Sequence, residues 1–187
     1  ELLKNGFTTA AVYCTSHTVS VDAFFDESSE RNLRMIAGKV LMDRNAPEEL
    51  LDDPQTGYDQ SKALIDKWHG RGRNLYAITP RFAPTSSPEQ LELAGVLYQN
   101  SDDVYVQSHV SENLAEIAWV RDLFPDTDSY LDVYAKMGLL GPRTLYGHGI
   151  HFSNTEIDMA AETKTSIVHC PTSNLFIGSG LFQYQKL

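Results

Sequence analysis

Short apolar runs alternate along the chain with segments that have the apolar spacing of amphipathic helices. The apolar runs are rich in β-branched and aromatic residues, which favours strands. The predicted strands are 7–14, 34–41, 75–79, 104–109, 144–148 and 166–170, and we expect the first of them to be buried. The predicted helices are 19–31, 58–70, 88–99, 113–123, 128–137 and 153–163.

Local signals mark several helix ends. Ser87 precedes Pro88 with Gln90 three residues on, and Ser153 precedes Glu156 at the same spacing, as in helix-capping boxes. Residues 1–7 read as the end of a helix with Gly6 as its carboxyl cap, so we expect an internal piece of a longer protein. Residues 45–56 are predicted to be a polar loop. In the segment 169–174, His169 or the Ser173–Asn174 pair could face the strand ends, and a structural turn is the equal alternative.

The regular alternation of strand and helix predicts parallel βα units. Two α/β architectures fit this pattern: an open doubly wound sheet and part of a (β/α)8 barrel. No G-x-G-x-x-G segment follows the first predicted strand, so a dinucleotide-binding sheet has no support. Polar residues gather where predicted strands end, and in a barrel those ends share one face, where active sites lie.

Composition narrows the function classes. The 187 residues carry a formal net charge of −10, which disfavours binding to nucleic acid. No apolar stretch approaches the about 18 residues that a membrane span requires, so we expect no membrane association. The two cysteines, Cys14 and Cys170, match no zinc-binding spacing, and a cytoplasmic location is the expectation.

The strongest chemical signal is the segment 107–113, Gln-Ser-His-Val-Ser-Glu-Asn. A predicted strand delivers His109 at its carboxyl end, and Glu112 follows three residues on. Imidazole is a good zinc or iron ligand, and a nearby carboxylate can move a proton to and from water. The alternative is a buried histidine beside a glutamate that caps the next helix. Ser108, next to His109, is a candidate substrate contact.

Two further strand ends carry candidate groups. His148 ends a strand between two glycines, which allow close approach of backbone or substrate. Arg81 and Phe82 follow the third strand and offer fixed donors and an apolar face for a planar ring. The alternative is a surface arginine beside a packed phenylalanine. The roles of the other histidines stay open: His17, His151 and His169.

Together these segments resemble the guanine deaminases of the amidohydrolase superfamily. The matching segments occur in the family's order across most of the chain: 80–86 (PRFAPTS), 107–113 (QSHVSEN), 148–151 (HGIH) and 169–174 (HCPTSN). The resemblance implies a (β/α)8 barrel that holds one zinc or iron ion and hydrolyses guanine to xanthine and ammonia. It implies a small purine substrate, and we expect a homodimer for the full-length protein.

The resemblance also implies residue roles. His109 matches a metal ligand, Glu112 the proton-shuttling carboxylate, and His148 a histidine that orients the attacking hydroxide. Arg81 and Phe82 match residues that hold the purine.

The chain departs from the family pattern in its metal ligands. The family carries a His-x-His pair on its first strand and an aspartate on its eighth, and neither is matched here. We therefore expect residues 1–187 to be one partial barrel domain covering strands two to seven, without a complete metal site and without activity by itself. The alternatives are a related amidohydrolase acting on a triazine, a nucleoside or another purine, and a non-catalytic truncated barrel.

Overall fold

The computed structural model describes residues 1–186 and consists mainly of βα units. The strands are β1 (Thr9–Tyr13), β2 (Arg34–Gly38), β3 (Val40–Leu41), β4 (Leu75–Pro80), β5 (Tyr105–Val110), β6 (Thr144–His148) and β7 (Ser166–Val168). The helices are α1 (Thr18–Glu30), α2 (Pro54–Trp68), α3 (Pro88–Gln99), α4 (Leu114–Leu123), α5 (Tyr130–Lys136), α6 (Asn154–Thr163) and α7 (Pro171–Ile177). Short 3₁₀ turns cover Leu3–Asn5, Glu48–Leu50 and Ala83–Thr85.

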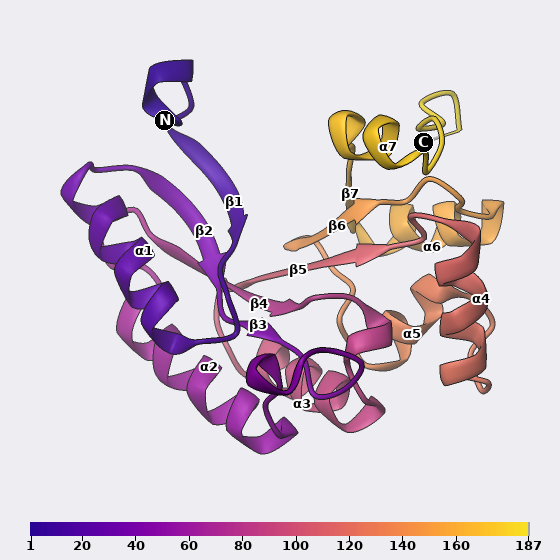
Figure 1. Cartoon of the computed structure of the whole chain (residues 1–187), viewed down its shortest axis with the longest axis horizontal. Helices are drawn as coiled ribbons and strands as arrows, with labels where there is room; N and C mark the ends of the chain where they lie inside the picture. Colours follow the sequence, from indigo (N-terminus) through magenta and orange to yellow (C-terminus); the bar gives the residue numbers. More distant parts are fainter. Residues whose placement is uncertain (187) are drawn as a thin grey trace.

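All strands pair in parallel, in the order β1-β2-β4-β5-β6-β7, and the short β3 also pairs with β4. Figure 1 shows a curved sheet with β1 and β7 at its two ends and with α1 to α6 on its outer side. The predicted parallel strands in sequence order are confirmed. The chain forms half of a (β/α) barrel and not an open doubly wound sheet.

A side-chain contact across the inner side of the sheet demonstrates its curvature. In the sheet order, β2 and β4 separate β1 from β5, so a flat sheet would hold β1 and β5 roughly 14 Å apart. Yet the Gln107 amide of β5 donates to the Val12 carbonyl of β1 at 2.9 Å and to Thr79 Oγ1 of β4 at 3.1 Å. The strands must therefore bend around the inner side.

The predicted caps are present. Ser87 Oγ accepts from the Gln90 backbone N–H at the start of α3. Ser153 and Glu156 form a reciprocal capping box at the start of α6. Gly6 caps the first 3₁₀ turn with φ = 80°, which glycine adopts at little cost.

Four element predictions were wrong. The first strand is not buried: every residue of β1 is exposed or half-buried, because among residues 1–186 it pairs only with β2. The second strand breaks at Lys39, whose backbone N–H donates to the side-chain hydroxyl of Tyr76 instead of to a backbone carbonyl of a neighbouring strand. α2 begins at Pro54, earlier than expected, with Asp53 as its cap. The sequence after Pro171 forms α7 and not only a turn, with Pro171 in its first turn.

The core lies between the sheet and the surrounding helices. Its largest buried side chains come from both layers, with Trp68 on α2, Tyr76 on β4, Tyr134 on α5 and Tyr146 on β6. This packing anchors each strand from outside and leaves the carboxyl ends of the strands to carry polar groups. Within residues 1–186, no helix has both the length and the apolar character that crossing a bilayer demands.

Candidate active site

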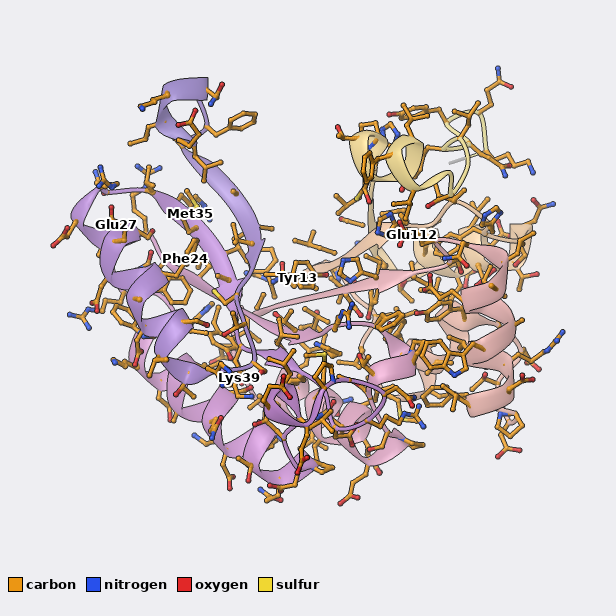
Figure 2. All side chains as sticks on the ribbon, viewed as in Figure 1. Tyr13, Phe24, Glu27, Met35, Lys39 and Glu112 are labelled. Carbon is orange, nitrogen blue, oxygen red and sulfur yellow. The ribbon has the colours of Figure 1, made fainter. Side chains whose placement is uncertain are left out.

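The predicted catalytic residues meet at the carboxyl ends of β5 and β6. His109 lies near the end of β5, Glu112 in the loop that follows, and His148 at the end of β6. The imidazoles of His109 and His148 stack with ring centroids 5.4 Å apart, and His148 Nδ1 lies 3.3 Å from Glu112 Oε1. Glu112 lies below α7 in the view of Figure 2. The three side chains therefore form one cluster.

His109 is held on both its ring and its backbone. The Arg81 carbonyl accepts hydrogen bonds from Nδ1 of the His109 ring at 2.6 Å and from the His109 backbone N–H at 3.2 Å. The Tyr13 ring packs on the imidazole with centroids 4.7 Å apart. Burial lowers the pKa of His109, and the nearby His148 and Arg81 charges lower it further, against the raising effects of the Arg81 carbonyl and Glu112. The ring is therefore neutral at pH 7.

His148 sits in a strained backbone position. Its φ of 79° lies in the left-handed region, which a residue with a Cβ rarely adopts and which often marks functional sites. Its Nδ1 lies 2.7 Å from Asn174 Oδ1 on α7, beside the Glu112 carboxylate. Glu112 Oε1 in turn accepts from Ser179 Oγ at 3.2 Å. These contacts fix the imidazole and the carboxylate in one orientation.

The Glu112 carboxylate does not cap α4. The cap is Asn113, whose side-chain oxygen accepts from the Glu116 backbone N–H at 2.9 Å. Glu112 instead directs its carboxylate at His148. The alternative prediction, in which Glu112 caps the next helix, is wrong.

The two histidines fit a metal ion. Each Nδ1 faces oxygen acceptors, namely the Arg81 carbonyl for His109 and the Asn174 and Glu112 oxygens for His148. Each Nδ1 therefore carries a proton, and in the neutral His109 ring this leaves a lone pair on Nε2, the usual arrangement for a metal-ligating histidine. Within residues 1–186, no group of three or more His, Cys, Asp or Glu side chains is placed to bind a metal.

A cavity of about 640 Å³ opens beside His109, within the roughly 300–1,000 Å³ range of small-molecule sites. Arg81 and His109 line it, whereas Phe82, Ser108, Glu112 and His148 do not. The remaining wall comes from β1, from β3 and the loop after it, and from the turn at Glu48–Leu50: Tyr13, Cys14, Thr15, Ser16, Val40, Met42, Pro47 and Leu50. The expected polar loop thus borders the cavity.

Arg81 offers an unpaired cation at this cavity. Its side chain is exposed, and none of the ion pairs in residues 1–186 involves it. Its guanidinium lies 5.1 Å from the centroid of the Phe82 ring, and that ring packs edge-to-face against Trp119. One guanidinium nitrogen, Nη1, donates to Met42 Sδ at 3.9 Å, a weak acceptor, and the other donors are available to a ligand.

Ser108 lies away from the cavity. Because side chains alternate along a strand, Ser108 faces the helices while His109 faces the inner side. Its side chain is fully buried, and its hydroxyl lies 2.9 Å from the Tyr134 hydroxyl and 3.4 Å from the Arg81 carbonyl. The arrangement gives Ser108 a supporting position, and the predicted substrate contact has no geometric support.

The remaining histidines lie apart from this cluster. His17 is exposed at the start of α1, and His151 Nε2 lies 3.0 Å from the Ser179 carbonyl. His169 contacts the Tyr184 hydroxyl and packs against Phe182. None of the three contacts His109, Glu112 or His148.

Neither cysteine has the character of a nucleophile. Burial raises the pKa of Cys14 to about 11 and also raises that of Cys170. Both thiols are therefore protonated at neutral pH.

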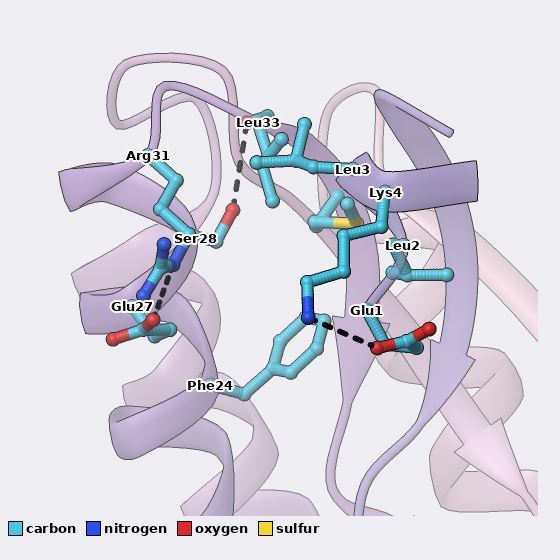
Figure 3. Close-up of a pocket in the computed structure, with 10 residues that line it drawn as sticks. Glu1, Leu2, Leu3, Lys4, Phe24, Glu27, Ser28, Arg31 and Leu33 are labelled. Carbon is cyan, nitrogen blue, oxygen red and sulfur yellow. Dashed lines mark hydrogen bonds and ion pairs between the residues drawn. The ribbon is translucent and has the colours of Figure 1, made fainter. Parts of the chain in front are cut away.

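A second cavity, of about 360 Å³, lies at the opposite end of the strands. Residues before β1 and at the start of β2 line it together with the second half of α1 (Figure 3): Glu1, Leu2, Leu3, Lys4, Phe24, Glu27, Ser28, Arg31, Leu33 and Met35. It holds no histidine and lies at the amino ends of β1 and β2, so it is separate from the candidate active site.

The structure adds residues that the sequence pattern did not single out. Tyr134 donates to the His109 carbonyl, and Tyr13 packs on the His109 ring. Both come from elements that only the folded chain brings next to β5, so no local motif marks them. Asn174 lies in a predicted segment, but only the position of α7 reveals that it contacts His148.

Comparisons with known proteins agree with this arrangement. The model of the amidohydrolase family matches residues 1–187. The chain is 56% identical over 186 residues to the guanine deaminase of Escherichia coli K12, and 42% identical over 185 residues to a probable guanine deaminase of Deinococcus radiodurans. These matches cover 100% and 99% of this chain. The chain spans 42% of the length of each of these relatives.

Solved structures give the same result. The E. coli guanine deaminase superposes with a TM-score of 0.97, covering 98% of this chain and 43% of that one. A guanine deaminase from C. acetobutylicum with bound guanine in its active site superposes with a TM-score of 0.92 at 37% identity, covering 99% and 44%. An atrazine chlorohydrolase from Arthrobacter aurescens, complexed with zinc, matches with a TM-score of 0.88 at 19% identity over 98% and 43%, which reflects the shared fold alone.

Proposed function

The chain belongs to the amidohydrolase family, and on that premise we propose that the full-length protein is a metal-dependent deaminase that hydrolyses guanine to xanthine and ammonia. The observation that carries the proposal is the cluster of His109, Glu112 and His148 beside a cavity with an unpaired arginine. The names of the similar proteins support guanine as the substrate.

His109 would hold one zinc or iron ion in the full-length protein through its Nε2 lone pair. Its Nδ1–H bond to the Arg81 carbonyl holds the ring in the orientation and tautomer that this role requires. A metal ion in such a site activates water as a nucleophile at neutral pH. The other ligands come from parts of the full-length barrel outside these residues, where the family pattern has a His-x-His pair and an aspartate.

Glu112 moves the protons of the reaction. Its carboxylate takes a proton from the attacking water and passes it to a ring nitrogen of guanine. It then takes the remaining proton of the added hydroxyl group and delivers it to the departing amine, so that water and guanine give xanthine and ammonia. His148, 3.3 Å from Glu112 Oε1, orients the nucleophile. The Ser179 and Asn174 contacts keep the two groups in place.

Arg81 binds the purine, and Phe82 supports the Arg81 guanidinium from outside the cavity lining. The guanidinium of Arg81 lines the cavity and has donors to spare for the oxygen and ring nitrogens of guanine. A site built on such donors rejects rings that lack the matching acceptors, because its polar groups are then left unpaired. Phe82 supplies an apolar surface beside the arginine.

The biological setting follows from the reaction. We infer a role in purine catabolism or salvage, a cytoplasmic location and a homodimeric full-length protein. Residues 1–187 then form one partial barrel domain of that protein, inactive without the flanking barrel strands.

The test is an assay of the purified full-length protein. Guanine, adenine and a chlorotriazine are supplied separately, and the released ammonia or chloride is measured with and without added zinc. Metal-dependent conversion of guanine to xanthine in preference to the other rings supports the proposal. Turnover of the triazine in place of guanine favours the related-hydrolase alternative, and no turnover of any ring by the metal-loaded protein refutes the proposal.

A further inference from the structure

A single buried hydroxyl joins the segment that carries Arg81 to the strand that carries His109. Tyr134, on α5, is fully buried. Its hydroxyl donates to the His109 carbonyl at 2.9 Å, accepts from the Ala83 backbone N–H at 2.9 Å and lies 2.9 Å from Ser108 Oγ. With one donor and two acceptor positions, this hydroxyl uses its whole hydrogen-bonding capacity.

These contacts close a ring of hydrogen bonds. The Arg81 carbonyl holds the His109 imidazole and its backbone N–H, and the chain runs from Arg81 to Ala83. Ala83 binds Tyr134, and Tyr134 returns to the His109 carbonyl. One phenolic oxygen therefore adds a second link between the Arg81–Ala83 segment and His109, beside the direct hydrogen bonds of the Arg81 carbonyl.

We propose that Tyr134 is a positioning residue that sets the Arg81–Ala83 segment against His109 and so couples purine binding to metal binding. The hydroxyl touches neither the cavity nor the Nε2 atom of His109, so it acts only through the groups it holds. The proposal rests on the proposed function for its substrate, whereas its metal-binding part needs no turnover.

Removal of the Tyr134 hydroxyl opens this ring of hydrogen bonds at its contacts with Ala83 and His109. Tyr134→Phe keeps the packed ring but leaves the Ala83 N–H buried and unpaired, which costs more than the bond itself contributed. The segment shifts to find another acceptor, and the Arg81 carbonyl moves with it. The His109 imidazole then loses its fixed orientation.

Tyr146→Phe is the matched control. Tyr146, on β6, is equally buried and packs against Tyr134 with ring centroids 4.7 Å apart. Its hydroxyl donates to the Leu139 carbonyl at 2.9 Å and makes no contact with residues 81–83 or His109. The two substitutions therefore remove the same atom from equally buried rings, and only one of them opens the hydrogen-bonded ring.

The experiment compares both variants with the unsubstituted full-length protein. Zinc affinity is measured by competition with a chelator, and kcat and KM for guanine are measured on zinc-saturated protein at a temperature where far-UV circular dichroism reports all three as folded. We expect Tyr134→Phe to weaken zinc binding about 10- to 100-fold, the usual effect of losing a group that orients a ligand. We expect KM to rise as well, and Tyr146→Phe to match the unsubstituted protein.

Equal zinc affinity and equal KM in the two variants would overturn the proposal, because the Tyr134 hydroxyl would then only stabilise the fold. If Tyr134→Phe does not fold, Ser108→Ala removes one hydrogen-bond partner of the hydroxyl and should weaken zinc binding less strongly; unchanged zinc affinity there also overturns it. A protein that shows the zinc effect but deaminates no guanine refutes the proposed function and leaves the positioning role supported.

Discussion

Glu112 occupies an unusual position for a carboxylate near the start of a helix. It leaves the capping of α4 to Asn113 and contacts His148 and Ser179 instead. A helix cap contributes about 1 kcal/mol to stability, and Glu112 does not make one, so its carboxylate is available for another contact. Its neighbours hold it beside the imidazoles, where the proposed proton transfer takes place.

Glu112→Gln should therefore separate proton transfer from metal binding. The amide matches the carboxylate in shape but cannot accept and return a proton at neutral pH. In the full-length protein we expect guanine turnover to fall about 10²-fold or more while zinc content stays unchanged. His109→Ala should lower zinc content as well, since it removes a ligand. Near-normal turnover by folded, zinc-loaded Glu112→Gln protein would remove Glu112 from the mechanism.

Neighbouring elements are joined outside the site by equally specific contacts. Asp22 on α1 accepts from Trp68 Nε1 on α2 at 2.7 Å and pairs with Lys67 at 2.8 Å. Partial burial raises the pKa of Asp22, but the bonds from Lys67 and Trp68 and the Lys67 charge outweigh it, so the pKa is lowered below its usual value of 3.8. This carboxylate thus stabilises the α1–α2 contact in its charged form.

The sign of the Asp22 contribution sets its pH dependence. A lowered folded-state pKa adds stability above about pH 4, and that stability disappears as the pH falls through the folded-state value. Asp22→Asn should cost about 1 kcal/mol at pH 7 and less at pH 3, in thermal unfolding of the full-length protein. Asp66→Asn is the control, since Asp66 is exposed and pairs only with Lys62 on its own helix. Equal costs at both pH values would contradict the assignment.

Close packing between α3 and the end of α5 makes glycine more favourable than alanine at position 95. Alanine usually stabilises a helix relative to glycine by about 1 kcal/mol. A Cβ on Gly95, however, would lie 1.8 Å from the Met137 carbonyl oxygen, a backbone atom that cannot move aside alone. We expect Gly95→Ala to destabilise the protein by about 1–3 kcal/mol in thermal unfolding.

Gly57→Ala on α2 provides the comparison for Gly95→Ala. A Cβ there would lie 3.1 Å from the end of the Leu41 side chain and 3.8 Å from Gln90 Nε2, both side-chain atoms that can move aside. Its effect should be clearly smaller. A Gly95→Ala protein as stable as Gly57→Ala would mean that α3 and α5 can separate without cost.

The sequence predicts elements well where the signal is local. The capped starts of α3 and α6 follow from Ser87 and from the Ser153–Glu156 pair, whose partners lie three residues away. α7 was missed because Pro171 is equally compatible with the end of a strand and with a first helical turn. The exposure of β1 was missed because it depends on which strands flank it, which the residues of β1 do not encode.

The same division applies to the candidate site. His109, Glu112, His148 and Arg81 could be singled out as candidates because strand ends and short motifs mark them. Tyr134 could not, because its partners lie 25 to 51 residues away in the sequence. A buried tyrosine in a helix looks like any other core residue until the fold places its hydroxyl.

At the scale of the whole molecule, the β7 end of the curved sheet carries an exposed apolar surface. The α7 segment and the residues after it expose large apolar side chains, with Phe176 89%, Leu181 76% and Leu175 66% exposed. Adjacent exposed apolar groups of this size are typical of surfaces that bind another surface. They lie at the end of the sheet opposite β1 (Figure 1).

We therefore expect the 187-residue chain, expressed alone, to self-associate with increasing concentration. Analytical ultracentrifugation should detect this, and Phe176→Ser with Leu181→Ser should reduce it. Val19→Ser is the control, because Val19 is 71% exposed but stands alone at the start of α1. A monomer at all concentrations, or equal behaviour of both variants, would contradict the expectation.

The strand order has a consequence for how the protein is made. From β2 to β7, every strand except the short β3 pairs with a strand that precedes it in the chain, so each of these strands finds its partner already synthesised. Loop-closure costs stay small because the partners are close in sequence, and domains begin to fold from the amino terminus during translation. Growth of the sheet can therefore keep pace with the ribosome, and the two imidazoles of the site meet as soon as β6 docks on β5.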